Sequence, residues 1–381
     1  MSDIDLDSRW PVEVVPEADL VGRAALVEAI CANILAGRSV SLMAPRRVGK
    51  TSVALEALRQ LESKGAIVAH IDFFGVDSKR HFAEQLIRQV IENSHSLRER
   101  LKQVGRAVRR AAGVVKPFWS MAQTEFGIDL GAENIDEDEL FRRALELPET
   151  LAQREERLCV VFLDEFQDAA RVLGPNVYAT MRSHFQLQPH TKHIFAGSHE
   201  SLLRPLFTRP NAPLLRYAVE VPFVEVPHGD WQTYIVRKFN EARLSCTPAL
   251  ADQIIYATGG HPADTMEVCQ QLEFAVRAAQ TRQVRLELLH VAVAAAAAVL
   301  SHVFDEIWEQ VGATSGARLT ARRIAAGEPA RPAAMHTQTY SRAVQALLDK
   351  GVLRRAPGRS HFIFPEPLFK RYVLRQDRSW A

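Results

Sequence analysis

The sequence of 381 residues predicts an α/β protein with a parallel sheet covered by helices on both faces. Short apolar segments at residues 39–43, 66–72, 158–163 and 192–198 have the length and composition of buried strands. Amphipathic stretches with helical spacing separate these segments, and such alternation is typical of parallel sheets. From about residue 226 to residue 300 the pattern becomes helical throughout.

A phosphate-binding loop pattern follows the first expected strand. Residues 44–52 have the sequence APRRVGKTS, which matches G-x-x-x-x-G-K-[ST] except that Ala44 replaces the first glycine. In this pattern, backbone N–H groups form a nest for phosphate oxygens at the start of a helix. Gly49 keeps the backbone free of side-chain obstruction, Lys50 reaches the β- and γ-phosphates, and Thr51 offers a hydroxyl to Mg²⁺. We expect phosphate contacts from the loop residues Pro45, Arg46, Arg47, Val48, Gly49, Lys50, Thr51 and Ser52.

Two carboxylates end another apolar segment, because Asp164 and Glu165 follow residues 158–163 directly. Ligands of open α/β sheets bind at the carboxyl ends of strands, so we expect Asp164 beside the phosphate loop, holding Mg²⁺ directly or through water. Glu165 is then placed to orient or deprotonate the attacking water. An Asp-Glu pair after a strand is also a common helix N-cap. The phosphate loop upstream favours the nucleotide site.

Charge is unevenly distributed along the chain. The net charge is +2, and residues 311–381 hold 13 Lys/Arg against 4 Asp/Glu, a local +9 that leaves −7 for residues 1–310. The hydrophobic share of 47% and the charged share of 24% are those of a globular protein. A basic end on an acidic body suggests an acidic partner, most commonly nucleic acid.

The sequence predicts a cytoplasmic protein without membrane segments. Its N-terminus lacks a signal-peptide core, and the most apolar stretch, residues 288–300, is too short to span a bilayer. Four cysteines lie too far apart for metal-ligand spacing and are expected to be reduced: Cys31, Cys159, Cys246 and Cys269.

We expect four units along the chain. An extended N-terminal arm (1–20) precedes the P-loop core (21–225), which carries an insertion at residues 94–140. A helical lid (226–300) and a C-terminal unit (301–381) follow. Within the insertion, a basic run could contact DNA, but a solvated helix face is favoured.

The C-terminal unit is predicted to be a winged helix-turn-helix. Three expected helices, at residues 303–311, 320–326 and 337–350, precede two short strands. A DNA-binding unit of this kind would present residues from its third helix and from its wing: Gln338, Tyr340, Ser341, Arg342, Arg354, Arg355 and Arg359. The alternative is a protein-interaction or autoinhibitory module packed on its own core.

Together these motifs resemble the archaeal-type ATPases in the STAND and origin-recognition-like branches of the AAA+ superfamily. The resemblance covers nearly the whole chain and rests on the order of six segments: VGR (21–23), PRRVGKTS (45–52), FLDEFQ (162–167), AGS (196–198), APLLR (212–216) and TGGHP (258–262).

The resemblance implies roles for residues outside the two main motifs. Val21, Gly22 and Arg23 would border the adenine, and Ser198 would sense the γ-phosphate. The lid would approach the nucleotide through Gly260, His261 and Pro262. In this family an arginine from a neighbouring subunit completes the site, which implies Arg216 in a nucleotide-dependent homo-oligomer. Leu215 replaces the usual glycine before it, so Arg209 is the alternative.

The leading hypothesis is a Mg²⁺-dependent ATPase that acts as a molecular switch, with ATP and Mg²⁺ as cofactors and Lys50, Glu165 and Arg216 as catalytic residues. Thr51 and Asp164 would be the metal ligands. A DNA-binding regulator or scaffold using ATP as a slow structural ligand is the alternative. In a third hypothesis, the protein is an ATP-gated scaffold of a larger assembly, and a separate protein supplies the effector in trans. No other metal is expected, because His261 has no Cys, His or carboxylate at ligand spacing.

Overall fold

The computed structural model describes residues 9–11, 14–94, 136–356 and 361–376. Its central element is a five-stranded sheet in the order β2-β3-β4-β1-β5, with every neighbouring pair parallel. The strands are β1 (Ser39–Met43), β2 (Ile67–Asp72), β3 (Cys159–Asp164), β4 (Thr191–Gly197) and β5 (Ala218–Glu220). The predicted parallel α/β fold is confirmed, and β5 is an edge strand that the apolar pattern did not indicate.

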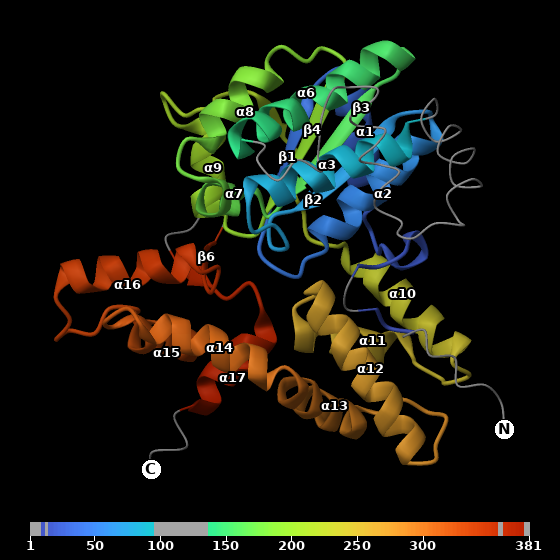
Figure 1. Ribbon diagram of the computed structural model, residues 1–381. Helices are drawn as coiled ribbons and strands as arrows, with labels where there is room; N and C mark the ends of the chain where they lie inside the picture. The colour runs from blue at the N-terminus through green and yellow to red at the C-terminus, as the bar shows by residue number, and fades with distance from the viewer. Residues whose placement is uncertain (1–8, 12–13, 95–135, 357–360, 377–381) are drawn as a thin grey trace, which may run out of the picture.

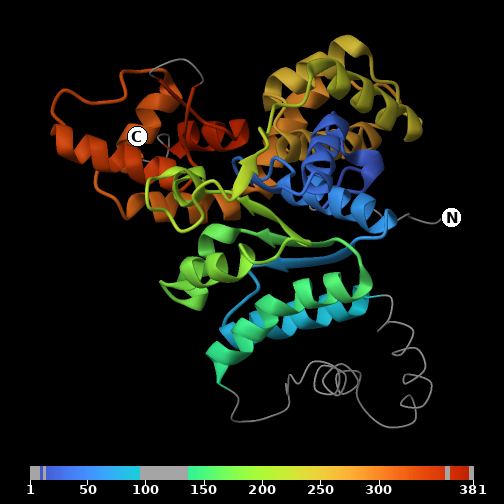
Figure 2. The same ribbon diagram turned by 90° about the horizontal axis from the view of Figure 1, so that it is seen from above.

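Helices cover both faces of the sheet, as Figures 1 and 2 show. Alternate strand residues face opposite ways, so Val40 and Leu42 pack with one helical layer while Ala69 and Ile71 pack with the other. The first layer consists of α1 (Ala24–Leu35) and α2 (Lys50–Ser63). The second consists of α3 (Lys79–Asn93), α6 (Glu137–Glu155), α7 (Ala169–Leu173), α8 (Val177–Phe185) and α9 (Glu200–Thr208).

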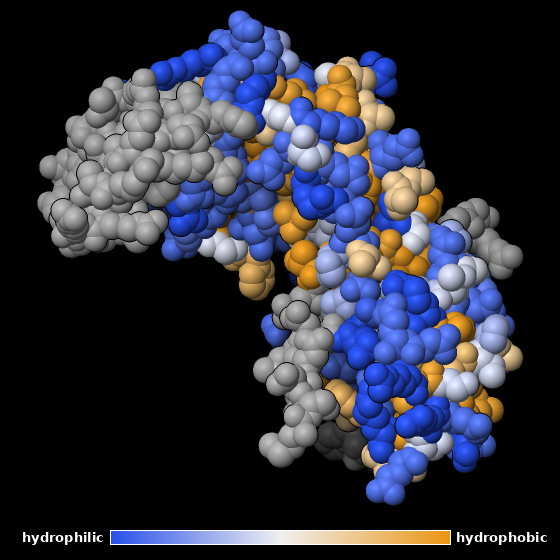
Figure 3. Space-filling view, turned by 90° about the vertical axis from the view of Figure 1, so that its right-hand side faces the viewer, coloured by the Kyte–Doolittle hydropathy of each residue, from blue (hydrophilic) through white to orange (hydrophobic). Residues whose placement is uncertain are grey.

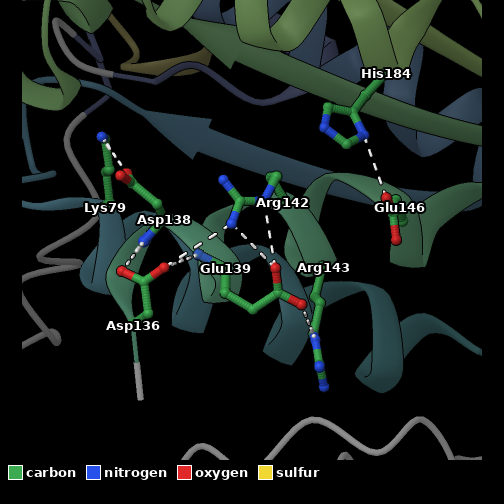
Figure 4. A network of polar contacts seen from close by, with 8 residues as sticks. All are labelled: Lys79, Asp136, Asp138, Glu139, Arg142, Arg143, Glu146 and His184. Carbon is green, nitrogen blue, oxygen red and sulfur yellow. Dashed lines mark hydrogen bonds and ion pairs between the residues drawn. The ribbon is translucent and has the colours of Figure 1, made fainter. Parts of the chain in front are cut away.

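Ion pairs accompany the apolar packing of α3, α6 and α8 (Figure 4). Lys79 of α3 pairs with Asp138, and Glu139 accepts hydrogen bonds from Arg142 and Arg143. These side chains are partly exposed, so the pairs contribute little to the stability of the fold. The predicted insertion joins α3 to α6, and its basic run and its expected hairpin lie outside the described residues.

Ten further elements form the lid and the C-terminal unit, which lie side by side below the sheet in Figure 1. The lid contains α10 (His228–Glu241), α11 (Pro248–Thr258), α12 (Pro262–Ala278) and α13 (Leu286–Val299). The C-terminal unit contains α14 (Ser301–Gly312), α15 (Ala317–Ala326), α16 (Thr337–Asp349), β6 (Arg354–Arg355), β7 (Phe362–Ile363) and α17 (Pro367–Arg375). Three helices and an antiparallel pair follow the predicted order, whereas α17 was not anticipated.

One hydrophobic cluster spans the lid and the C-terminal unit and includes Trp10 from the N-terminal segment. Trp10 is 1% exposed, contacts the rings of Tyr234 and Phe239, and donates from Nε1 to Glu273 Oε2 at 3.0 Å. The N-terminal segment was expected to be an extended arm. Its described part is anchored on the lid by an aromatic side chain, because burying an indole is strongly favourable.

Among the described residues, no single helix is long and apolar enough to cross a membrane, although α13 and α14 reach that length and composition together with a 56° bend between them. On the face shown in Figure 3, hydrophilic residues dominate the surface of the lower lobe. All four cysteines lie within the described part of the chain, and each is buried and unpaired. Localisation in the cytoplasm stays a prediction.

Candidate nucleotide-binding site

The phosphate-binding loop connects the end of β1 to the start of α2. Gly49 has a φ of 91°, and no heavy atom would approach an added Cβ, so glycine is needed there for its backbone conformation and not for space. Lys50 begins α2 and folds back across the loop, with its Nζ donating to Pro45 O at 2.6 Å. Burial lowers the pKa of Lys50 to about 8, against the opposing effect of Glu165 and Asp164.

The two predicted metal ligands lie in contact. Thr51 Oγ1 donates to Asp164 Oδ2 at 2.6 Å, joining the start of α2 to the end of β3. Asp164 is 3% exposed, and burial raises its pKa above the ordinary value despite the hydrogen bond from Thr51. A buried carboxylate beside a hydroxyl, at the carboxyl edge of a parallel sheet, is an oxygen donor set that suits Mg²⁺.

Glu165 is fixed by donors from two other segments. Its Oε2 accepts from Gln167 Nε2 at 2.6 Å, from Ser198 Oγ at 2.7 Å and from Ser198 N at 3.2 Å. Burial opposes its ionisation, but these hydrogen bonds and the charge of Lys50 outweigh burial and hold the pKa of Glu165 below its ordinary value. The carboxylate is therefore ionised at neutral pH. Ser198, predicted to sense the γ-phosphate, directly contacts this carboxylate.

Gln167 is a residue of this site to which the sequence analysis gave no role. Its side chain fills the space beside Gly197, where an added Cβ would lie 2.2 Å from Gln167 Oε1. Gln167, the second residue after the Asp-Glu pair, and Gly197, which ends β4, therefore form a matched pair. The Asp-Glu-x-Gln spacing was visible in the sequence, but its partner is close only in three dimensions.

A cavity of about 510 Å³ adjoins these groups, a volume typical of small-ligand sites. Its polar end includes Lys50, Thr51, Asp164 and Glu165, and its apolar end is lined by Val14, Leu20, Val21, Val226, Trp231, Pro262 and Met266. Asp72 and Phe74 also line it, and Asp72 pairs in register with Asp164. The sequence signal for Asp72 was the same as for Asp164, a carboxylate at the end of an apolar strand.

Of the three residues expected at the adenine, Val21 and Arg23 line the cavity, whereas Gly22 does not. The guanidinium of Arg23 is engaged with protein groups: it donates to Val48 O at 3.2 Å and lies 4.4 Å from the ring centroid of Phe223. Burial lowers its pKa to about 10. Arg23 therefore holds the phosphate-binding loop in place through its hydrogen bond to Val48 O.

Arg47 links the phosphate-binding loop to the C-terminal unit. Its NH1 lies 2.5 Å from Oε1 of Glu366, the residue immediately before α17. Beside this pair, His261 caps α12, and its Nδ1 lies 3.4 Å from Oδ1 of the fully buried Asp264. Asp264 Oδ2 accepts from Leu368 N at 2.9 Å. We call Arg47, His261, Asp264 and Glu366 the junction.

The junction corrects one prediction. The sequence analysis found no carboxylate at ligand spacing from His261, yet Asp264 and Glu366 both offer oxygens near it. Burial opposes protonation of His261, but Asp264 and Glu366 outweigh it and raise the pKa of this imidazole. Arg47 already supplies a cation to Glu366, so the residues form a charge-paired cluster. His261 itself does not line the nucleotide cavity, whereas its neighbour Pro262 does.

Comparison with solved structures identifies the fold. A Walker-type ATPase of Pyrococcus abyssi superposes with a TM-score of 0.64 at 16% identity, over 94% of this chain and 97% of its own. The ORC2 protein of Aeropyrum pernix, in its ADPNP–ADP complexes, gives 0.60 at 14% identity over 98% of both chains. The chain therefore shares the fold of these two proteins over nearly its whole length. No family model and no curated protein matches its sequence.

Within this fold, Arg216 lies at the opposite end of the sheet from the phosphate-binding loop. It is exposed and precedes β5, whose first residue, Ala218, pairs with Ser39 at the start of β1. The loop, by contrast, follows the end of β1. Arg209 ends α9 and lines a different hollow, together with Pro45 and Ser198. Neither arginine lines the nucleotide cavity of its own chain.

The predicted DNA contacts divide into two groups. Gln338 and Arg342 are exposed on α16, and Tyr340 is half-buried there. In the wing, Arg354 is paired with Glu225 of the chain segment before α10, with NH2 2.6 Å from Oε1, and Arg355 lies over Phe362. Arg359 lies outside the described residues. Arg354 therefore contacts the segment between the sheet and the lid.

Proposed function

We propose that this chain binds ATP and hydrolyses it with the help of Mg²⁺. The observation that carries the proposal is the convergence of Lys50, Thr51, Asp164 and Glu165 on one end of a single cavity. The fold shared with Walker-type ATPases supports it. Thr51 and Asp164 would hold Mg²⁺, which supplies charge neutralisation between the β- and γ-phosphate oxygens.

The protein groups divide the remaining work. The backbone N–H groups of the loop and the buried Lys50 ammonium would bind the phosphates. Glu165 would accept the proton of the attacking water through Oε1, because Oε2 already receives three hydrogen bonds. Gln167 and Ser198 would act as positioning residues that keep this carboxylate ionised and aimed. The apolar end of the cavity, with Val21 and Trp231, would take the adenine.

A neighbouring copy of the chain would complete the site through Arg216. The position of Arg216, at the start of β5 and away from its own cavity, supports action in trans. A guanidinium placed beside the γ-phosphate stabilises the charge of the transition state. The protein would then be a nucleotide-dependent homo-oligomer whose hydrolysis depends on assembly.

The second candidate function is that of a DNA-binding regulator, for which ATP is a slow structural ligand. The exposed Gln338 and Arg342 on α16 and the local charge of +9 favour it. In both functions the C-terminal unit, as a winged helix, would couple nucleotide state to a partner. ATP hydrolysis is favoured over structural binding of ATP because Glu165 is present and held in an ionised form.

Calorimetric titration with Mg·ATP tests the proposal. We expect saturable binding by the wild type, no measurable binding by Lys50→Ala, and wild-type binding by Lys64→Ala. Lys64 is a matched control because it is an exposed lysine at the far end of the same helix. Equal ATP affinity of the wild type and Lys50→Ala would show that this cavity is not the nucleotide-binding site. Phosphate release measured with and without duplex DNA then separates turnover from structural binding.

A further inference from the structure

A second hollow lies between the ATPase core and the C-terminal unit. Its volume is about 510 Å³, and it shares no lining residue with the nucleotide cavity. One wall comes from α9 and the residues before it, and the other from the end of α16 and from the wing. Since α16 packs against α9, this hollow is part of the contact between the two units.

Positive charge dominates the lining of this hollow. Four arginines and one carboxylate, that of Glu200, line it, and Glu200 Oε2 lies 3.6 Å from Arg204 NH2. Arg204 pairs with Glu220 at 2.6 Å, and Arg354 pairs with Glu225. Among the described residues, the side chains of the other two, Arg209 and Arg355, form neither hydrogen bonds nor ion pairs. In this hollow, positive charge without a carboxylate partner in the described part of the chain is therefore limited to these two arginines, which are both exposed.

Two buried donors in this hollow lack partners within the described part of the chain. They are the Ser201 hydroxyl, near the start of α9, and the Arg354 Nε–H, in the wing. A buried donor without an acceptor costs about 1–3 kcal/mol, so such groups are rare unless a ligand satisfies them. The two donors come from opposite walls of the same hollow. An oxyanion is the group that accepts from both a hydroxyl and a guanidinium.

We propose that this hollow is a binding site for a phosphate-bearing ligand. Phosphate is favoured over a carboxylate because it carries more charge and more acceptor oxygens, which suits the two guanidinium groups without a carboxylate partner, Arg209 and Arg355. Leu348, Leu353 and Pro205 add an apolar surface for the part of the ligand beyond the phosphate. The ligand would contact α9 and the wing together and so fasten the C-terminal unit to the core. The proposal does not depend on ATP hydrolysis.

The test uses the full-length Lys50→Ala protein, so that the phosphate-binding loop does not contribute, and titrates it with pyrophosphate by calorimetry. We expect saturable binding, weakened about tenfold or more by Ser201→Ala and by Arg209→Ala. Arg38→Ala is the matched control and should bind like the parent, because Arg38 is an exposed arginine just before the amino end of β1, whereas Pro45 and Ser198 of the hollow follow the carboxyl ends of β1 and β4. Without ligand, Ser201→Ala should melt at the parent temperature or above it, since it removes a buried unpartnered hydroxyl.

A second arm identifies the source of the phosphate. A short single-stranded oligonucleotide that competes with pyrophosphate shows that the site takes a nucleic-acid backbone. Pyrophosphate binding without competition shows that it takes a small phosphorylated molecule, and either result supports the site. Absence of saturable binding by both probes overturns the proposal. So does binding that neither Ser201→Ala nor Arg209→Ala weakens.

Discussion

Two neighbouring arginines of the phosphate-binding loop lie in different parts of the molecule. Arg46 stays within the ATPase core, with its Nε 3.4 Å from Ser198 Oγ and its NH2 3.4 Å from His199 Nε2. Arg47 leaves the core and pairs with Glu366, which is 319 residues away in the sequence. The loop therefore takes part in two regions, the phosphate end of the cavity and the junction.

These two regions differ in construction. The phosphate end is formed by residues at the ends of three strands of one sheet and at the start of one helix. Its geometry is therefore determined by the packing of the sheet domain. The junction joins the loop, the lid and the C-terminal unit through charged groups that are largely or wholly buried. Changes at the phosphate end should therefore alter chemistry. Changes at the junction should alter how the units hold together.

The largest expected effect tests whether the phosphate end is complete within one chain. We expect Arg216→Ala to lower hydrolysis by about 10³-fold, the scale of a lost arginine finger. Mixing this variant with Lys50→Ala should restore part of the activity, since each contributes the half that the other lacks. Phosphate release measured over a concentration series should rise more steeply than linearly. A rate that rises linearly with protein concentration, without rescue on mixing, would mean that one chain hydrolyses ATP by itself. Loss of hydrolysis in Arg209→Ala but not in Arg216→Ala would mean that Arg209 is the arginine that acts in trans.

The next effect concerns the charge of Lys50. Its pKa is about 8 without nucleotide, and the negative triphosphate should raise it, so ATP binding above pH 8 requires proton uptake. Affinity should be flat below that pH and should fall by up to about tenfold for each pH unit above it. Dissociation constants at pH 7, 8 and 9 test this expectation. Constant affinity up to pH 9 would show that Lys50 remains charged throughout.

The smallest effect on turnover distinguishes the two arginines. Arg47→Ala leaves the buried Glu366 without its cation and should destabilise the protein by about 2 kcal/mol, with hydrolysis within about threefold of wild type. Arg46→Ala should show the reverse pattern, with unchanged stability and slower hydrolysis. Thermal unfolding and phosphate release on both variants give the comparison. The double variant Arg47→Ala/Glu366→Gln should recover part of the stability that Arg47→Ala loses. If Arg46→Ala and Arg47→Ala change stability and hydrolysis in the same way, the two regions do not differ in function.

The sequence indicated the segments of the candidate site that are continuous along the chain. The strand at β1, the loop from Pro45 to Ser52 and the Asp164-Glu165 pair are continuous segments whose residue types are set by local conformation and chemistry. Parallel-sheet geometry then brings the strand ends to one edge, as the register of Asp72 with Asp164 shows. The strand segments alone are therefore enough to predict that these carboxylates lie at one edge of the sheet.

The remaining contacts depend on how separate units pack. Nothing near Arg47 in the sequence indicates Glu366, and nothing near Trp10 indicates the lid residues around Tyr234. The pairing of Arg354 with Glu225 was likewise not indicated by the residues around either side chain. Such contacts join surfaces formed by different segments, so a periodic pattern within either segment does not specify them.

ATP hydrolysis in this cavity would require Glu165 as the base. The most direct measurement is Mg²⁺-dependent phosphate release by the wild type and by Glu165→Gln, with ATP affinity determined on the same samples. We predict that Glu165→Gln binds ATP like the wild type and releases phosphate roughly 10²-fold more slowly. Equal rates for the two proteins would contradict the account, since Glu165 would then serve only to hold Gln167 and Ser198 in place.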